Sequence, residues 1–466
     1  MLFGTDGWRA VIAREFTFAN LERVAQAYAD YLLQQSGSGR APVAIIGFDR
    51  RFLSESFAQR AADVLAANGI SIALFEQAEP TPLVSWTVKH VQADGGVVIT
   101  ASHNPPEFNG FKIKAPWGGS ADPETTAAVE RLVDKNVPKR AQLSAPRHEL
   151  IAPAISAYRD HVKAYVDLVR LRETSFQVVV DSMHGSAGSW IESFLTGDRL
   201  RIETVRANRD PLFGGVNPEP IDQNLSALKR RVLETKALVG VATDGDADRL
   251  GAVDELGHTL TMHDVVPLLL LHLIRNRHMT GGVVRTFSQS VLLKRIAEAH
   301  QLRLYETPIG FKYIANLMLK ENILIGAEES GGIGLKGHIP ERDGVLNGLL
   351  FLEAIIAAGK PPSEMLRDLH DEFGEFHFGR TDLHIPISRG LELVERLATK
   401  PPVEVGGYGV AEVQTTDGTK LILADESWLL FRQSGTEPVL RIYAEGTSLE
   451  KMATLLDCGN RIAQTL

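Results

Sequence analysis

A structural pattern that occurs three times is the feature that most restricts how this chain can fold. Each copy has an apolar run rich in β-forming residues, then a polar or glycine-containing turn, then an amphipathic stretch. The runs are residues 43–48, 177–180 and 282–286. Strand–turn–helix units of this kind predict an α/β fold. The repetition lies in the pattern alone, because the segments share no sequence identity at a fixed period.

The helix after the first run is well marked. Phe57, Ala61, Val64 and Leu65 fall at helical spacing, and the Asn-Gly pair at 68–69 is a stop signal. The last hundred residues differ, with short predicted strands and a final helix. This pattern predicts a smaller α+β domain at the carboxyl end.

The length of the chain and its polar, proline-containing stretches suggest how many domains it has and where they divide. The 466 residues, at about 150 per domain, predict about three domains. Polar, proline-containing stretches at 136–153 and 359–363 indicate linkers. A further break is expected after Asp248, where one strand ends and another begins at Leu250.

Charge and cysteine content exclude several classes of protein. The 49 basic and 58 acidic residues give a net charge of −9, so a chain-wide basic surface for nucleic acid or anionic lipid is absent. Cys458 is the single cysteine, which excludes an intrachain disulfide and a cysteine-based zinc site. The apolar stretch 265–274 is broken by Pro267 and His272, so we expect a buried helix there. We expect a cytoplasmic protein with no nucleic-acid or membrane partner.

The first loop with candidate reactive residues is TASHNP, residues 100–105, directly after an apolar strand. A serine at the exit of a strand is well presented, so Ser102 is a candidate nucleophile or phosphoryl carrier. His103 is able to bond to nearby groups, and Lys112 is close enough in sequence to add a positive charge. An ordinary turn with a capping serine fits these residues equally well. The G-x-S-x-G elbow is absent, which argues against a serine esterase.

The second loop is DGDADR, residues 244–249, which also follows a predicted strand. Asp244, Asp246 and Asp248 stand at alternate positions and repel one another, and such oxygen ligands are what Mg²⁺ takes alongside a phosphate oxygen. An EF-hand does not fit, because Arg249 occupies the position that needs glycine. The alternative is a solvated acidic turn.

The third loop is GAEESGG, residues 326–332. Acidic side chains between glycines suit bidentate recognition of sugar hydroxyls, and a flexible glycine turn is the alternative. The stretches 307–310 and 338–344 could line the same pocket.

The fourth loop is RQSGTEP, residues 432–438. An arginine, two hydroxyls and an unhindered glycine amide form a cradle for a dianion. The alternative is a tight hairpin with an exposed arginine. Neither a Walker A loop nor a G-x-G-x-x-G turn after a strand occurs.

Taken together and in this order, the loops resemble those of the α-D-phosphohexomutase superfamily, the phosphoglucomutase and phosphomannomutase group. The resemblance begins at FGTDGWR, residues 3–9, and runs through 100–105, 244–249, 328–332 and 432–438. Four ordered motifs are far more specific than any one of them.

The resemblance implies three similar α/β domains with mixed sheets around a central cleft, plus a smaller carboxyl-terminal α+β domain. That is one domain more than the length predicts. The expected domains are 1–150 with the phosphoserine loop, 151–252 with the metal-binding loop, 253–366 with the sugar-binding loop, and 367–466 with the phosphate-binding loop.

The resemblance also implies roles for individual residues. Ser102 would be carried as phosphoserine, and a phosphate oxygen on it would join the three aspartates in binding Mg²⁺. The implied sets are the catalytic residues Arg9, His103, Lys112 and Arg249; the metal ligands Ser102, Asp244, Asp246 and Asp248; the sugar-loop residues Glu328 and Ser330, with Thr307, Gly310, His338 and Arg342 beside them; and Arg432, Ser434, Gly435 and Thr436 for the non-transferred phosphate.

The implied reaction is the interconversion of hexose 1-phosphate and hexose 6-phosphate through hexose 1,6-bisphosphate, which is also the expected activator. The sugar loop lacks the Met and His of members that act on both glucose and mannose, and the Gln of aminosugar members. We therefore expect a preference for glucose, with mannose as a further substrate, in a monomer or homodimer. Arg342 stands where glucose enzymes often have lysine, which leaves the general base unassigned.

Other functions fit the same residues to different degrees. A hexose 1,6-bisphosphate synthase would share all four loops and differ in releasing the bisphosphate. A non-catalytic sugar-phosphate-binding protein would be expected to lack Ser102 or an aspartate of the acidic loop, and none is missing. A D-x-D phosphatase is disfavoured by Asp248, and a serine hydrolase by the absence of an elbow and placed partners.

Overall fold

The computed structural model describes residues 3–4, 7–37, 39–143, 146–197, 199–435 and 438–465. They belong to two compact units, which are described separately. Unit 1 comprises Met1–Leu260, Ala315–Lys320 and Ser330–Ser363, and unit 2 comprises Thr261–Ile314, Glu321–Glu329 and Glu364–Leu466.

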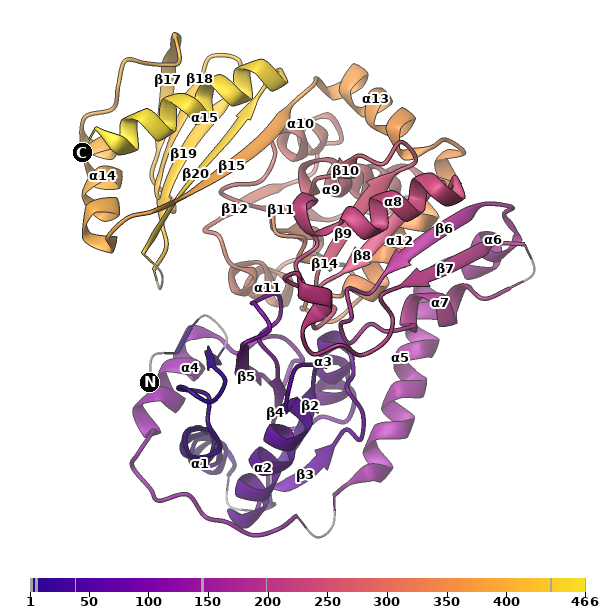
Figure 1. Cartoon of the computed structure of the whole chain (residues 1–466), viewed down its shortest axis with the longest axis vertical. Helices are drawn as coiled ribbons and strands as arrows, with labels where there is room; N and C mark the ends of the chain where they lie inside the picture. Colours follow the sequence, from indigo (N-terminus) through magenta and orange to yellow (C-terminus); the bar gives the residue numbers. More distant parts are fainter. Residues whose placement is uncertain are drawn as a thin grey trace. The chain divides into compact units, whose positions relative to one another are not determined.

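The first sheet of unit 1 is mixed, with the strand order β1-β5-β4-β2-β3, of which β5, β4, β2 and β3 are labelled in Figure 1. β2 pairs in parallel with β3 and β4, and β5 runs antiparallel to β4 and β1. The strands are β1 (Gly7–Val11), β2 (Val43–Phe48), β3 (Ser71–Leu74), β4 (Gly95–Ile99) and β5 (Phe108–Lys114), and the helices are α1 (Phe18–Gln35), α2 (Ser54–Ala67), α3 (Thr81–His90) and α4 (Pro123–Leu132). The first strand and helix predicted from the sequence pattern are confirmed as β2 and α2.

The second sheet of unit 1 has the order β10-β9-β8-β6-β7. Its strands are β6 (Gln177–Asp181), β7 (Arg201–Val205), β8 (Val239–Thr243), β9 (Leu250–Asp254) and β10 (Thr259–Leu260). The helices of this part are α5 (Ile151–Tyr165), α6 (Leu168–Glu173), α7 (Trp190–Leu195) and α8 (Ser226–Thr235), with short 3₁₀ turns at His148–Leu150, Phe213–Gly215 and Asp222–Asn224. Unit 1 also contains β14 (Ile333–Leu335) and the buried helix α12 (Gly344–Ala358).

The two sheets of unit 1 share one topology. In each, one strand (β2 or β6) has a parallel neighbour on both sides, and the chain turns back from the inner neighbour (β4 or β8) into an antiparallel strand. The loop TASHNP lies at this reversal between β4 and β5, and DGDADR lies at the same reversal between β8 and β9. The repeated sequence pattern thus places the two loops at equivalent ends of equivalent strands.

Two expectations about domain limits need correction. β9 pairs with β8 along its whole length, from Leu250 opposite Thr243 to Asp254 opposite Val239. The break expected after Asp248 is therefore absent, and a boundary between 252 and 253 would cut a strand. The acidic loop is a tight strand connection, which resembles a linker only in composition. The linker expected at 136–153 also extends too far, because α5 already begins at Ile151. Pro153 lies in the first turn of this helix, where a proline costs no helical hydrogen bond.

Unit 2 contains two sheets. In the first, β11 (Gly282–Thr286) pairs in parallel with β12 (Leu304–Thr307) and β13 (Ile323–Ala327). The second is antiparallel, with the order β15-β20-β19-β18-β17-β16. Its strands are β15 (His377–His384), β16 (Glu404–Val405), β17 (Tyr408–Gln414), β18 (Thr419–Leu423), β19 (Trp428–Gln433) and β20 (Val439–Gly446). This confirms the smaller α+β domain at the carboxyl end.

The helices near these sheets are α9 (Met262–Leu271), followed by a π-helical turn at His272–Asn276, then α10 (Val291–Ala299), α11 (Phe311–Lys320), α13 (Pro362–Phe373), α14 (Ile387–Thr399) and α15 (Leu449–Gln464). α9 is buried and contains Pro267, as expected. Within the described ranges, no single helix is long and apolar enough to cross a membrane, and only the consecutive helices α12 and α13, as a bent pair, meet the length and composition requirement.

Candidate active site

Ser102 lies in the loop that follows β4 and has a left-handed backbone conformation, with φ of +52°. Non-glycine residues adopt this conformation in only a few per cent of cases. The Ser102 amide donates a hydrogen bond to Thr100 Oγ1 at 2.8 Å, and its hydroxyl donates to Asp244 Oδ2 at 2.9 Å. The turn therefore directs the serine hydroxyl at the acidic loop of the second sheet.

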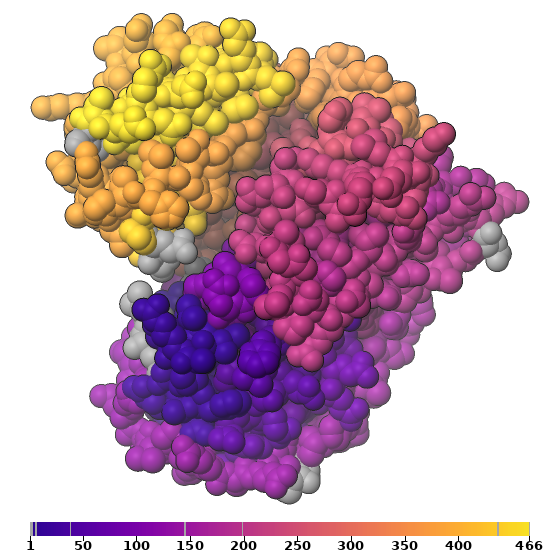
Figure 2. Space-filling view, in the orientation of Figure 1, coloured from indigo at the N-terminus to yellow at the C-terminus, as the bar shows by residue number. Residues whose placement is uncertain are grey.

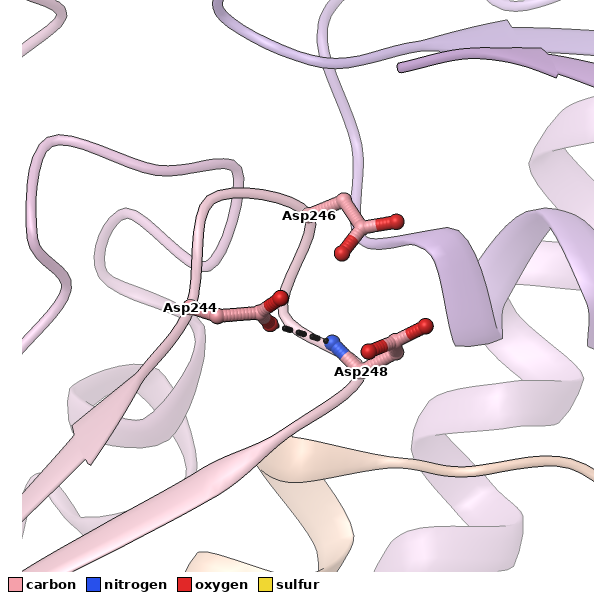
Figure 3. Close-up of side chains that lie close together, drawn as sticks. All are labelled: Asp244, Asp246 and Asp248. Carbon is pink, nitrogen blue, oxygen red and sulfur yellow. Dashed lines mark hydrogen bonds between the residues drawn. The ribbon is translucent and has the colours of Figure 1, made fainter. Parts of the chain in front are cut away.

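The acidic loop gathers its three carboxylates in one small buried volume (Figure 3). One oxygen of each of Asp244, Asp246 and Asp248 lies within 4.8 Å of the others, and none of the three residues is exposed to solvent. Asp244 Oδ1 accepts the amides of Asp248 at 3.0 Å and Arg249 at 3.1 Å, which closes the loop.

Two oxygens of the acidic loop are suited to a metal ion. Oδ1 of Asp246 and Oδ1 of Asp248 are buried and accept no hydrogen bond from any residue that the structure describes. A buried carboxylate oxygen without a donor is unfavourable, and carboxylate oxygens are the preferred ligands of Mg²⁺. The three aspartates therefore fit a divalent cation.

Cations from other segments surround this cluster. Lys112 Nζ on β5 lies 2.8 Å from Asp248 Oδ2 and 3.4 Å from Asp246 Oδ2, and Arg342 lies 2.8 Å from the same Asp248 oxygen. Burial raises the pKa of Asp248, but Arg342 and Lys112 more than offset it, so this pKa lies below its ordinary value. By contrast burial, with Asp246 and Asp248, raises the pKa of Asp244 well above its usual range. The nearby cations therefore stabilise the ionised form of Asp248 but not that of Asp244, and a further positive charge at the cluster would be favourable.

The remaining residues expected around a phosphoryl group also lie in unit 1. His103 Nδ1 is 3.3 Å from Ser102 Oγ. Burial, with Arg249 and Arg9, lowers the pKa of His103 well below 6.5, so its ring is neutral at pH 7. Arg9 on β1 donates to Asn104 Oδ1 at 2.9 Å, which ties the first strand to the serine loop.

Arg249 and Arg342 extend this basic surround. Arg249, the last residue of the acidic loop, is 8% exposed and lies 3.4 Å from Glu219 Oε1. Arg342 follows Glu341, whose Oε2 accepts a hydrogen bond from Lys114 at 2.6 Å. Alternating charges therefore run from Lys114 through Glu341 and Arg342 to Asp248 of the acidic loop.

Two residues in this part of unit 1 were missed from the sequence. Thr81, at the start of α3, donates to Asp246 Oδ2 at 2.8 Å. Arg51, after β2, donates to backbone carbonyls of the serine loop. The signal for Arg51 was an acidic residue, Asp49, two positions earlier at the end of a buried strand, which is where an internal ion pair is expected.

His338 lies in a packed network rather than on an open surface. Its ring is stacked on Trp86 with the centroids 5.9 Å apart, its Nδ1 is 3.0 Å from His161 Nε2, and its Nε2 is 3.0 Å from Asp343 Oδ2. Asp343 also caps α12 and accepts a hydrogen bond from Tyr158. Because Asp343 directly follows Arg342 in the chain, this geometry suits a residue that positions Arg342.

The sugar-loop residues divide between the units, because Glu328 belongs to unit 2 and Ser330 to unit 1. Glu328 follows β13 and is 5% exposed. Next to it, Glu329 accepts a hydrogen bond from Ser288 at 2.7 Å. Because β11 and β13 are parallel, the segments after both strands meet at one edge of the sheet.

Asp417, which the sequence did not indicate, joins two of the expected substrate loops within unit 2. Its Oδ2 accepts the Ile309 amide at 2.8 Å and Arg432 Nε at 2.9 Å. The Ile309 loop contains Thr307, which is 7% exposed, and Gly310, whose φ is +136°. One carboxylate therefore holds both loops together.

Two arginines face each other beside the phosphate loop. Arg432 stands directly opposite Arg441 on the neighbouring strand β20, and like charges in this position are destabilising. Ser434 is 5% exposed, and among the residues that the structure describes no heavy atom lies within 4 Å of the position that a Cβ on Gly435 would take. Thr436 lies outside the described residues. Arg441 interrupts the apolar run of β20, which was the available sequence signal for it.

Comparison with known proteins now identifies the family. Models of phosphoglucomutase/phosphomannomutase α/β/α domains I, II and III match residues 1–140, 156–257 and 263–373, and the model of the C-terminal domain matches residues 393–457. A phosphoglucomutase/phosphomannomutase from Thermococcus kodakarensis is 33% identical over 99% of this chain and 98% of its own. The chain belongs to the phosphoglucomutase/phosphomannomutase family. Its members are mutases, so this protein is an intramolecular phosphotransferase.

Other relatives cover the whole chain as well. A phosphoglucosamine mutase from Novosphingobium aromaticivorans is 31% identical over 98% of this chain and 97% of its own. A solved structure from Thermus thermophilus, assigned as a phosphomannomutase, has a TM-score of 0.87 and 36% identity, with 99% of each chain covered. The predicted architecture of α/β domains with mixed sheets and a carboxyl-terminal domain is confirmed.

Removal of one acidic charge should weaken Mg²⁺ binding without lowering the stability of the metal-free protein. Asp244→Asn keeps an Oδ1 acceptor for the two loop amides and removes a repelled charge. We therefore expect a melting temperature close to that of the wild type without metal. At a hundredfold excess over Kd, Mg²⁺ should raise the free energy of unfolding of the wild type by about 2.7 kcal/mol and so raise its melting temperature. The variant should lose most of that response. Thermal unfolding with and without Mg²⁺ measures both, and Asp222→Asn, an exposed carboxylate in the same part of unit 1, is the control. An undiminished Mg²⁺ response in Asp244→Asn would contradict the metal site.

Acid should weaken unit 1 through His161. Burial, followed by His338, lowers the pKa of His161 to about 4. In the unfolded chain a histidine has a pKa of about 6.5. Between these values the unfolded state binds more protons, so stability is full above about pH 6.5 and falls as the pH drops towards 4. Melting curves from pH 7 to 4.5 should therefore decline more steeply for the wild type than for His161→Asn, and parallel declines would refute the assignment.

Proposed function

We propose that this enzyme interconverts hexose 1-phosphate and hexose 6-phosphate, with Ser102 as the phosphoryl carrier. The observation that supports this most strongly is the 2.9 Å hydrogen bond from Ser102 Oγ to Asp244 Oδ2 inside the buried acidic cluster. A serine hydroxyl beside carboxylates suited to a metal, with Lys112 and Arg342 close by, has the parts that phosphoryl transfer requires.

The residues of the chain divide the work of the transfer. Asp244, Asp246 and Asp248 would hold Mg²⁺ together with an oxygen of the phosphoserine, and Mg²⁺ when bound supplies charge neutralisation for the phosphoryl oxygens. Arg9, Lys112 and Arg249 add fixed positive charge around the same group. When the phosphoryl leaves Ser102, the proton of the accepting sugar hydroxyl ends on Ser102 Oγ, which then donates to Asp244.

The far end of the substrate is assigned to unit 2. Arg432, Ser434, Gly435 and Thr436 would hold the phosphate that is not transferred, and a bound dianion would relieve the repulsion between Arg432 and Arg441. Sugar hydroxyls would be bound by the glutamate and serine of the sugar loop, Glu328 and Ser330, and Thr307 and Gly310 would lie beside them. His338 and Arg342 would complete this part of the site, His338 by positioning Arg342.

A single phosphate cradle implies that the substrate binds in two orientations. The first transfer gives hexose 1,6-bisphosphate, which must turn over before the other phosphoryl returns to Ser102. The sugar loop would then bind the hydroxyls of the same ring in both orientations of the substrate. Free bisphosphate would act as the activator by phosphorylating Ser102.

We propose glucose as the preferred sugar and mannose as a further substrate. The loop reads Glu328, Glu329 and Ser330 followed by two glycines, which favours glucose-type recognition. Relatives include proteins named as phosphoglucosamine mutases, so glucosamine phosphate belongs in the test. Binding of nucleic acid or membrane is not expected, and a cytoplasmic location and a monomeric or dimeric state stay predictions.

Phosphorus NMR tests the reaction and the sugar together. The purified protein is incubated with Mg²⁺, a trace of glucose 1,6-bisphosphate, and glucose, mannose or glucosamine 1-phosphate in separate samples. We expect conversion to the 6-phosphate at constant bisphosphate, fastest for glucose. Bisphosphate that accumulates after a phosphoryl donor is added would indicate a synthase, and no turnover of any sugar would indicate a binding protein.

Loss of the Ser102 hydroxyl should abolish turnover while the protein still binds its ligand. Ser102→Ala removes the carrier and with it the phosphoryl group, but it leaves the residues proposed to bind the sugar and the non-transferred phosphate. We therefore expect kcat to fall at least about a thousandfold with little change in substrate affinity. Initial rates and calorimetric binding measure the two effects. Ser56→Ala, the same change at an exposed position of α2, should be neutral. Retained mutase activity in Ser102→Ala would disprove the phosphoserine route.

A further inference from the structure

Arg51 is a fully buried arginine that holds the loop of Ser102 from behind. Its side chain is 0% exposed and forms an ion pair with Asp49 at 3.1 Å. Its other donors reach four backbone carbonyls, namely Ser102 at 2.6 Å, Asn104 at 2.6 Å, Pro105 at 2.7 Å and Phe108 at 3.1 Å. Because a guanidinium has five N–H donors, these five contacts use its full capacity.

One of the carbonyls that Arg51 binds belongs to Ser102, the residue with the left-handed backbone. Ser102 has a φ of +52°, and such a conformation persists only where the surroundings over-determine it. On the amide side, Thr100 Oγ1 accepts the Ser102 N–H. On the carbonyl side, Arg51 donates to the oxygen. The two contacts fix the peptide planes on either side of Ser102.

Arg51 also lies against the second sheet region of unit 1. Its guanidinium is 4.9 Å from the centroid of the buried Phe213 ring, and its carbonyl accepts a hydrogen bond from Arg209. The space-filling view shows the deep pink segment of unit 1 packed on the indigo amino-terminal part (Figure 2). The serine loop is thereby braced against the same region that carries the acidic loop.

We infer that Arg51 is the positioning residue for the phosphoryl-carrying serine, held in turn by Asp49 and Phe213. It touches no proposed substrate atom and acts through the backbone of residues 102–108. The inference rests on the proposed role of Ser102. A lysine at position 51 would keep the charge but offers three donors from one point, so it cannot bind four carbonyls and Asp49 together.

Arg51→Lys tests this role through the balance of kcat and KM. A misplacement of about 1 Å costs about a hundredfold in rate, so we expect kcat to fall about a hundredfold while KM changes less than about threefold. Phosphorylation of Ser102 by glucose 1,6-bisphosphate, followed by intact mass, should slow by a similar factor. Arg50→Lys is the matched control, because Arg50 bonds to Ala207 and to no residue of the serine loop. The control should stay within about twofold of the wild type.

Hydrogen exchange keeps the test independent of activity. In Arg51→Lys, amides of residues 100–108 should exchange faster, while those of α1 and α15 stay unchanged. Phe213→Leu retains all five hydrogen bonds of Arg51 and should give a smaller shift in the same direction, which covers the case in which Arg51→Lys does not fold. Folded variants with the wild-type kcat and wild-type exchange in this loop would overturn the inference. If the wild type itself turns over no sugar phosphate, the proposed function fails, whereas the exchange result still decides whether Arg51 holds the loop.

Discussion

The repulsion among three buried carboxylates is the constraint on which the rest of the site depends. Asp244, Asp246 and Asp248 are all inaccessible to solvent and share one small volume. Such a cluster can stay ionised only if positive charge is brought to it. Lys112 comes from an antiparallel strand of the other sheet, and Arg342 comes from the turn before α12. The fold of unit 1 is therefore arranged so that segments distant in sequence supply the counter-charges, and a divalent cation would supply the remainder.

A repeated topology explains why the chemistry falls on similar loops. In both sheets of unit 1, the loop follows an inner parallel strand at the point where the chain turns back antiparallel. The sugar loop likewise follows β13, a parallel strand of unit 2. Carboxyl ends of parallel strands are where α/β folds place their ligands. Serine, aspartate and glutamate therefore stand at three equivalent points, and the three roles proposed for them would share one structural plan. The carboxyl-terminal domain departs from it, since its loop joins two antiparallel strands on which Arg432 and Arg441 stand opposite each other.

Buried polar side chains hold the backbone of several loops in this protein. Thr100 and Arg51 bind the peptide groups on either side of the left-handed Ser102. Asp417 does comparable work in unit 2, where it joins the Ile309 loop to Arg432. Asp343 caps α12 while it binds His338. In each case a buried polar side chain satisfies several partners, which makes the loop geometry rigid.

Much of this protein was readable from its sequence, because strands, helices and catalytic loops are local patterns. The apolar runs predicted β2, β6 and β11, and the alternate aspartates predicted the acidic cluster that the structure contains. Contacts across long distances in the chain were decided only by the tertiary structure. Asp49 marks Arg51 for an ion pair, but nothing near Arg51 in sequence reveals that it binds the Ser102 carbonyl about fifty residues away. Likewise nothing near Asp417 reveals that it accepts the Ile309 amide, more than a hundred residues away. The acidic loop was also read as a domain break, because a tight connection and a linker have the same polar composition and only strand pairing distinguishes them.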